Sequence, residues 1–415
     1  MKARNFVSAL TLTSALVAPA ISSAATISGW NTDTVDVGPA VSAGETGASV
    51  IYDRALPDAS ATTNGQIVYG APEADAPGIK VVQEDYSVFD GCIMASSGAI
   101  CTSPFQSGKR VKQQVTDTGS IDLVFDVEAD GEGESIYQVY HRLINVTGGT
   151  LDGVTFELGT GVGDDFVASG TADGLRFATT ADGVEFGPDD VAAFSQYPFG
   201  LFGGAPLNPN PLSLPGFFDT ADRAGFDVTL GEDMIVSGGM YGSYDDLFGG
   251  WLTQGDVPDG LLYDYNPGVA DPLVMAWASD LGWEFLRGTD PLSALNDLGV
   301  EPISSLVFDY DYAFDPVHGI SADMMTYILT SLVDPDGNPL DYATDLVVDA
   351  IEDLANLNMT FAVAIDDAFA SSYDGFTLRA TTHGLAAVPL PAGAPLLLGG
   401  LAALGLMRRR QRRSA

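Results

Sequence analysis

The stretch SIDLVFDVEADGEGESIYQVYHRLINVTGGTLDGVTFELGTGVG, residues 120–163, decides the fold class of this chain. Three segments in it, 121–128, 136–145 and 151–158, carry apolar side chains with a period of two. Successive side chains of a strand point to opposite faces of a sheet, so this period predicts strands with one buried and one wet face. Asp-Gly and Gly-Gly turns separate the segments, which indicates antiparallel strands. We therefore predict a mainly β chain whose body is an antiparallel β-sandwich.

Strand patterns continue on both sides of this stretch. Brief β-prone runs at 48–52 and 65–69 precede it, with prolines breaking the chain between them. Two further strands, 360–365 and 375–381, are expected to complete the same domain. The body is thus predicted to draw its strands from both ends of the sequence.

Residues 188–268 differ in composition, because proline, glycine and aromatic residues are dense there. One β-prone segment, 226–236, interrupts them. We expect long loops or insertions whose aromatic side chains pack back on the body. An aromatic, acidic surface that holds a sugar polymer is the alternative interpretation of the same residues.

A helical insertion is predicted between residues 270 and 358. Asp-Pro pairs at 271–272 and 290–291 place a capping residue before a proline, as at the first turn of many helices. Further helices are expected to begin at Ser321 and to cover 342–357, where apolar residues recur with helical spacing. The expected fold is therefore a β-sandwich-like body with a few α-helices in its C-terminal half.

The turn between the last two expected helices carries oxygen ligands at the spacing of a calcium loop. They stand at its first, third, fifth and twelfth positions: Asp334, Asp336, Asn338 and Asp345. This is the ligand order of an EF-hand. Pro339 occupies the sixth position, where that loop needs glycine, so an ordinary polar turn is the competing interpretation. Calcium is the only cofactor that the sequence suggests.

The chain has two cysteines, Cys92 and Cys101. Oxidised thiols persist in compartments other than the cytosol, and there we predict one disulfide that closes a ten-residue loop. Such a bond stabilises a fold by about 2–3 kcal/mol. No histidine lies near either cysteine in the sequence, so a zinc site is not indicated.

The N-terminus has the pattern of an export signal. Lys2 and Arg4 supply positive charge, residues 6–20 are apolar, and residues 23–25 are small, as at a signal-peptidase site. Residues 1–25 are therefore predicted to be a signal peptide for the Sec export machinery, with the mature chain starting at Thr26.

The C-terminal segment, residues 388–415, has three parts. A proline motif comes first: Val388, Pro389, Leu390, Pro391 and Ala392. A short apolar run, 395–407, follows, and it is shorter than the roughly 20 residues that cross a bilayer. A basic cluster comes last: Arg408, Arg409, Arg410, Arg412 and Arg413. Arginines favour the cytoplasmic side, which leaves residues 26–387 outside the cytoplasm.

These three parts together resemble the VPLPA variant of the PEP-CTERM sorting signal of Gram-negative bacteria. The resemblance implies that an exosortase recognises the tail in the membrane and that the protein is sent to the cell surface or extracellular matrix. An ordinary C-terminal membrane anchor is the alternative.

Segments of the body also resemble a known family. Residues 27–33, 89–95 and 103–109 are similar to the choice-of-anchor proteins, most closely the branch labelled F. Members of that family share a body and differ in their C-terminal anchoring signal. The resemblance implies a secreted, surface-destined protein, and it supplies no catalytic residues.

The mature body is strongly acidic. All 56 Asp and Glu residues lie between 26 and 391, whereas seven of the 17 Lys and Arg residues lie in the two terminal signals. Ten basic residues therefore remain in the body, and its net charge is near −46. A charge of this size repels nucleic acid and anionic membrane surfaces, which excludes nucleic-acid binding.

Catalytic motifs are missing from the sequence. It contains no HExxH, no G-x-S-x-G and no phosphate-binding glycine loop, and its three histidines are far apart: His141, His318 and His383. We therefore predict no catalytic residues and no enzyme. The expectation is a structural or adhesive surface protein, with a secreted carbohydrate-binding or carbohydrate-active protein as the alternative and an extracellular polysaccharide as a candidate partner.

Overall fold

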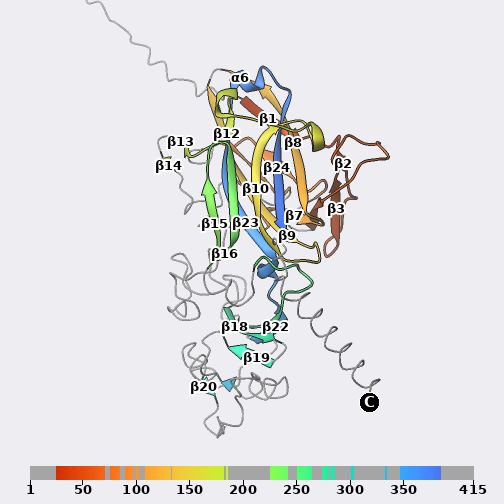
Figure 1. Cartoon of the computed structure of the whole chain (residues 1–415), viewed down its shortest axis with the longest axis vertical. Coiled ribbons are helices and arrows are strands. Elements are labelled where there is room, and N and C mark those ends of the chain that lie inside the picture. Colours follow the sequence, from red (N-terminus) through yellow and green to blue (C-terminus); the bar gives the residue numbers. More distant parts are fainter. Residues whose placement is uncertain are drawn as a thin grey trace, which may run out of the picture.

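The computed structural model has two large β-sheets that pack face to face, with a smaller sheet at one end (Figure 1). The prediction of a mainly β, sandwich-like body is confirmed. The residues that the structure describes are 25–70, 75–84, 89–96, 100–101, 108–131, 133–181, 184–185, 225–241, 250–263, 273–279, 282–285, 301–302, 332–333 and 346–384.

Sheet A has seven strands, all antiparallel. Six of them follow one another in the order β1 (Ala25–Trp30), β8 (Gly119–Ala129), β24 (Gly375–Gly384), β10 (Leu151–Thr160), β16 (Met234–Tyr241) and β15 (Gly225–Leu230), and β11 (Val167–Ala168) pairs with β10. Two interior strands, β8 and β24, are distant in sequence, so sheet A joins the beginning and the end of the described chain.

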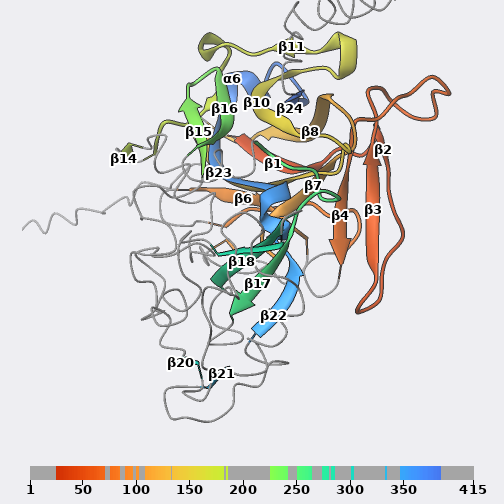
Figure 2. The same ribbon diagram turned by 60° about the horizontal axis from the view of Figure 1, so that its bottom comes forward.

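Sheet B has nine strands. Seven follow the order β12 (Leu175–Phe177), β23 (Asn356–Asp366), β9 (Glu134–Asn145), β7 (Val111–Val115), β4 (Gly65–Gly70), β3 (Thr46–Ile51) and β2 (Val35–Asp36). The two others are β5 (Lys80–Val82) and β6 (Gly91–Met94), where β6 pairs with β9. Both β6 and β7 run parallel to β9, on the edge opposite β23. Figure 2 shows β3 and β4 extending this sheet to one side.

The three segments of the opening stretch form the strands that were predicted, β8, β9 and β10, yet no two of them pair with each other. β8 and β10 lie in sheet A with β24 between them, whereas β9 lies in sheet B. The turns that separate them are therefore not hairpins, because each carries the chain from one sheet to the other. The predicted runs at 48–52 and 65–69 are β3 and β4, and the closing strands are β23 and β24.

The core lies between the two sheets and is rich in aromatic rings. The rings of Phe125 and Phe376, on neighbouring strands of sheet A, are stacked with centroids 5.3 Å apart. The rings of Phe156 in sheet A and Phe361 in sheet B are in contact, with centroids 5.2 Å apart. Burying such a side chain stabilises the fold by about 1.5–3 kcal/mol, so these contacts hold the sheets together.

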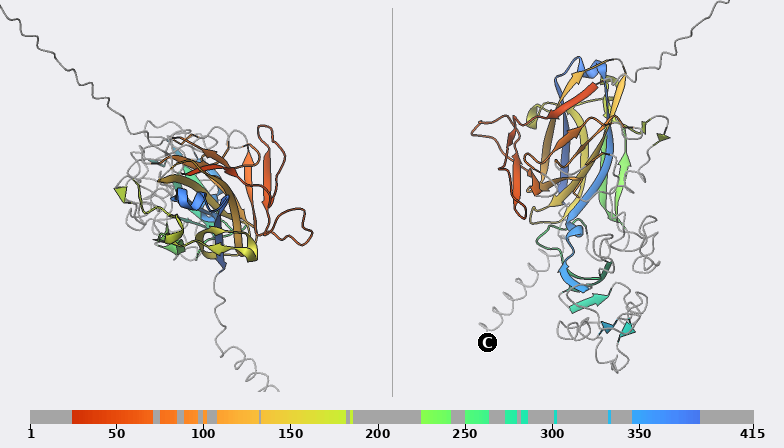
Figure 3. Two further views of the ribbon diagram at one scale, coloured as in Figure 1. Left: turned by 90° about the horizontal axis from the view of Figure 1, so that it is seen from above. Right: turned by 180° about the vertical axis from the view of Figure 1, so that it is seen from behind.

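A small antiparallel sheet lies below the sandwich in Figure 1 and also when the molecule is seen from behind in Figure 3. Its order is β19 (Gly282–Phe285), β18 (Leu273–Ser279), β17 (Asp259–Tyr263) and β22 (Leu346–Ala350). The helical insertion predicted for 270–358 is therefore wrong at two places: the helix expected after Asp271 is β18, and the one expected over 342–357 contains β22, the short 3-10 turn η3 (Glu352–Ala355) and the start of β23.

Local sequence explains this error. Val347 and Val348 are β-branched, and such residues lose side-chain freedom in a helix but fit a pleated sheet. Antiparallel pairing of β22 with β17 then outweighs the helical spacing of the apolar residues. Residues 290–298 and 321–331, where two further helices were expected, lie outside the described residues. The one α-helix that the structure describes is α6 (Asp367–Ala370), capped by the side chain of Asp366.

Two corrections remain in the C-terminal half of the chain. The single strand predicted over 226–236 is a hairpin, β15 and β16. The short strands β20 (Glu301–Pro302) and β21 (Leu332–Val333) pair with each other, so the helix expected from Ser321 does not include its last apolar residue, Leu332. A further small hairpin joins β13 (Thr180–Ala181) to β14 (Val184–Glu185).

The small sheet is attached to the sandwich around Asn145, the last residue of β9. The buried side-chain amide of Asn145 donates to the carbonyl oxygens of Gly149 at 2.8 Å and of Trp251 at 3.0 Å. Trp251 is fully buried, as expected for a loop aromatic that packs on the body, and its Nε1 donates to the carbonyl of Ala355 at 2.7 Å. Gly148 allows the turn with a φ of 79°. Both chain connections of the small sheet are thus fixed at one point.

Candidate functional site

Most residues that the sequence proposed as sites lie outside the described residues. This applies to the sorting motif with its arginines, Val388, Pro389, Leu390, Pro391, Ala392, Arg408, Arg409 and Arg410, and to the calcium ligands, Asp334, Asp336, Asn338 and Asp345. Within the described residues, no group of three or more His, Cys, Asp or Glu side chains could hold a metal ion. The same described residues contain no helix that is long and apolar enough to cross a membrane.

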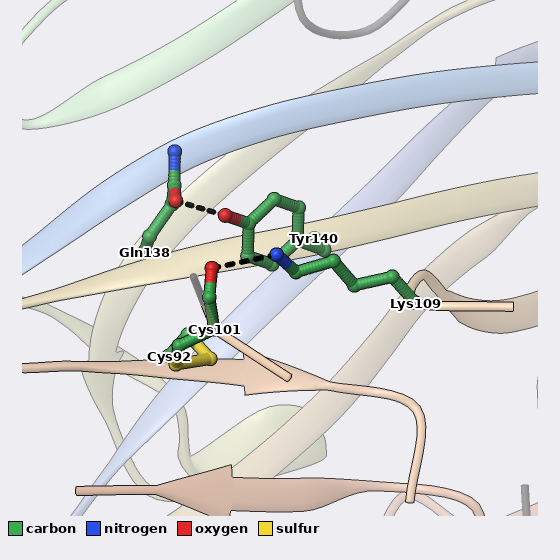
Figure 4. Close-up of a disulfide and its surroundings, with 5 residues drawn as sticks. All are labelled: Cys92, Cys101, Lys109, Gln138 and Tyr140. Carbon is green, nitrogen blue, oxygen red and sulfur yellow. Dashed lines mark hydrogen bonds between the residues drawn. A yellow bond between two sulfur atoms is a disulfide. The ribbon is translucent and has the colours of Figure 1, made fainter. Parts of the chain in front are cut away.

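The predicted disulfide between Cys92 and Cys101 is confirmed (Figure 4). Cys92 lies on β6, the Cα atoms are 5.9 Å apart, and both side chains are fully buried. They pack with Met94 and Tyr140 on the face of sheet B that points away from the core. The disulfide therefore fixes a loop against the outer face of this sheet.

A buried lysine completes this cluster, and sequence reasoning missed it. The Nζ of Lys109 donates to the carbonyl oxygen of Cys101 at 2.7 Å and lies 4.0 Å from the centroid of the Tyr140 ring. Figure 4 shows the Tyr140 hydroxyl, which donates to Oε1 of Gln138. Burial lowers the pKa of Lys109 to about 8, the charge of Arg110 adds to this, and Glu84 opposes it. The ring face and the carbonyl stabilise the cation in an apolar setting.

Two more cations lie side by side on the same outer face. Lys112 of β7 and Arg142 of β9 are register partners in the parallel pair of strands. Burial lowers the pKa of Lys112, with the charge of Arg142 as the next cause, and Glu352 acts in the opposite direction. With Lys109 and Arg110, four of the ten basic residues between 26 and 391 belong to β7, β9 and the residues just before β7.

Amide side chains extend this group across the sheet. Asn358 of β23 pairs with Arg142, and its Oδ1 accepts a hydrogen bond from Nε at 2.7 Å. On the other side, Nε2 of Gln66 on β4 donates to Oε1 of Gln114 on β7 at 2.7 Å. We call these five residues the outer strip: Asn358, Arg142, Lys112, Gln114 and Gln66. Asn358 is buried and the other four are half-buried.

A sequence signal for the outer strip exists, although it is visible only with hindsight. Residues 91–116 contain three basic residues and no Asp or Glu, in a body where acidic residues outnumber basic ones more than fivefold. Arg142 is distant from this segment in the sequence, so only the pairing of β7 with β9 shows that it belongs to the same cluster.

The described histidines do not form a catalytic site. His141 lies between the sheets. Its ring centroid is 5.5 Å from that of Phe156, and its Nε2 is 3.0 Å from Oε1 of Gln113. Burial lowers the pKa of His141 to about 3. His383 lies in sheet A, and its Nε2 is 2.8 Å from the hydroxyl of Thr155. A buried neutral imidazole cannot reach a substrate, so His141 is a core residue.

One buried ion pair fixes a loop on sheet A. Arg379 of β24 donates from Nε and Nη2 to the two carboxylate oxygens of Asp122, each at 2.7 Å. The backbone N–H of Gly163 donates to the same carboxylate, and the carbonyl of Gly163 accepts from Arg379. The guanidinium also lies 3.8 Å from the centroid of the Phe166 ring. These bonds tie Gly163 to β8 and β24.

No family model, curated protein or solved structure matches this chain.

Proposed function

We propose that this chain is an exported protein that an exosortase-type enzyme sorts to the cell surface or extracellular matrix, where it has a structural or adhesive role. The observation that carries the proposal is the tail at 388–415, with its proline motif, short apolar run and arginine cluster. The signal-peptide pattern of residues 1–25 supports the same route.

The body adds support from its covalent structure. Its two cysteines form one buried disulfide, Cys92–Cys101, at the centre of a packed cluster. Disulfides persist in oxidising compartments and are rare in the cytosol. A two-sheet scaffold with a large negative charge is also suited to staying soluble outside the cell.

The experiment that tests this function is an intact-mass measurement on the native protein. Protein recovered from the cell surface and the medium is compared with protein from the inner membrane. We expect the outer species to lack residues 1–25 and the residues beyond the 388–392 motif. A tail that is intact, on protein found wholly in the inner membrane, would contradict sorting and favour a tethered periplasmic domain.

A secreted carbohydrate-binding or carbohydrate-active protein is the second candidate, and the outer strip is the observation that favours it. Amide groups and cations in two neighbouring rows of one sheet face are suited to hydroxyl and carboxylate groups of sugars. Binding to a panel of polysaccharides without turnover supports adhesion. Release of reducing sugar that survives repurification would favour an enzyme instead.

A further inference from the structure

The guanidinium of Arg142 is held in place by the sheet beneath it. Asn358 is 4% exposed and accepts a 2.7 Å hydrogen bond from Nε. Among the described residues, Arg142 makes no other hydrogen bond or ion pair. Its two Nη groups therefore remain as donors for a ligand. A guanidinium offers them as a fork that matches the two oxygens of a carboxylate.

Lys112 gives the same position a second positive charge. Its register partner is Arg142, and neighbouring strands are about 4.8 Å apart, so both cations act on one anionic group. The acid-free segment 91–116 supplies β6 and β7, so the two strands beside this edge of β9 bring no carboxylate. The carboxylate of Glu352 favours the charge of Lys112.

The amides of the outer strip suit the uncharged part of a sugar. Gln66 and Gln114 lie one row from Lys112 on the same face and are joined by a 2.7 Å hydrogen bond. Each keeps further amide donor or acceptor capacity after that bond. Hydroxyl groups of a sugar ring can use this capacity while a carboxylate on the same ring reaches the cations.

From this arrangement we propose that the outer strip binds carboxylate-bearing sugar units of an acidic extracellular polysaccharide. The proposal rests on the surface location argued above, since only there does the protein meet such a polymer. It goes further by naming the residues and the ligand chemistry.

The net charge of the body does not prevent this binding. At physiological ionic strength the Debye length is about 8 Å, so carboxylates elsewhere on the surface are screened from a ligand at the strip. The competing occupant is the acidic surface of a second copy. Screening acts on a second copy in the same way, so the amides decide between the two: Gln66 and Gln114 lie beside the cations and match the hydroxyl groups that a carboxylate-bearing sugar carries on the same ring.

Binding of native, disulfide-intact protein to polygalacturonate tests the proposal. Its methyl ester, which has the same sugar without the charge, is the matched control ligand. We expect binding to polygalacturonate that weakens as salt rises and is lost on esterification. Equal binding to both polymers, or to neither, would overturn the proposal.

Variants locate the site. Arg142→Gln should weaken binding about tenfold or more, because a charged hydrogen-bond donor pair is lost. Arg142→Lys should keep the salt dependence with weaker binding, because charge is kept and the fork is lost. Arg54→Gln is the control: it removes the same charge from an exposed ion pair with Asp53 and should bind like the wild type. Equal near-ultraviolet circular dichroism of all variants shows that the fold is intact.

Two outcomes separate this proposal from the others. If Arg142→Gln and Lys112→Gln bind like the wild type, the outer strip is not the site. If they abolish a concentration-dependent dimer in sedimentation while polygalacturonate does not bind, the ligand is a second copy and the proposal fails. Because these measurements use purified protein, they are independent of the mass measurement that tests sorting.

Discussion

His141 is a titratable residue placed where its charged form cannot be solvated, and this gives a pH dependence. Burial lowers its pKa from 6.5 to about 3. Between these values the unfolded chain binds a proton that the folded protein does not. His141 therefore costs the folded protein no stability above pH 6.5. Its cost grows as the pH falls from 6.5 towards 3. The expected contribution of this residue is a loss of about 1.4 kcal/mol per pH unit below 6.5.

The variant His141→Gln tests this, because glutamine keeps a polar partner for Gln113 and does not titrate. Urea unfolding at pH 7, 6 and 5 gives the free energy of unfolding of both proteins. The two curves should converge as pH falls, since the many carboxylates contribute equally to both. If the free energies of unfolding of the two proteins fall in parallel from pH 7 to pH 5, His141 does not cause the loss of stability in acid.

The contact partner of a residue can be predicted from sequence where only one partner is possible. It cannot be predicted where the fold brings residues of distant strands together. Two cysteines can form one disulfide within the chain, so Cys92–Cys101 was predictable. The Lys109 contact with Tyr140 was not, because a lysine is ordinarily a surface residue and its partner lies on another strand. For the same reason, the sequence did not show that Lys112 and Arg142 lie next to each other on paired strands.

At the element scale, alternation predicts strands but not their partners. β8, β9 and β10 were predicted with nearly correct bounds, because a period of two is a local property. Their distribution between two sheets depends on β23 and β24, which are more than 200 residues away in sequence. The helix prediction over 342–357 failed for a related reason, since apolar spacing on a short segment fits either structure until a neighbouring strand decides.

The ion pair between β8 and β24 should be important for stability. Asp122 is 4% exposed, and both of its oxygens accept hydrogen bonds from Arg379. Removing one partner of a buried pair leaves an uncompensated charge, which costs about 3–5 kcal/mol. We therefore expect Arg379→Met to lower the free energy of unfolding by that amount in urea titrations.

A double variant separates charge from packing in this pair. Asp122→Asn combined with Arg379→Met removes the uncompensated carboxylate and should recover part of the loss. Arg176→Met is a matched control, because its partner Glu134 is far more exposed and surface pairs contribute about 0–1 kcal/mol. Similar losses for Arg379→Met and Arg176→Met would contradict a special role for the buried pair.

At the scale of the whole molecule, self-repulsion is the dominant electrostatic term. Residues 26–391 hold 56 acidic and ten basic side chains, so the protein is destabilised by its own charge, and cations in the medium reduce that cost. We expect the melting temperature to rise with NaCl, because screening shortens the range of repulsion. At equal ionic strength, millimolar Ca²⁺ should raise it further, because a divalent ion binds to close carboxylates.

The 334–345 turn decides how this calcium effect is interpreted. If the four oxygen ligands form a site, then Asp334→Asn with Asp336→Asn should abolish most of the Ca²⁺-dependent rise, measured against EGTA. If binding is diffuse, a control that removes two carboxylates elsewhere, Asp58→Asn with Asp75→Asn, should reduce the rise equally. A melting temperature that is the same in EGTA and in millimolar Ca²⁺ would exclude a specific calcium site and diffuse calcium binding alike. The body would then tolerate its charge through screening and through the distance between its carboxylates alone.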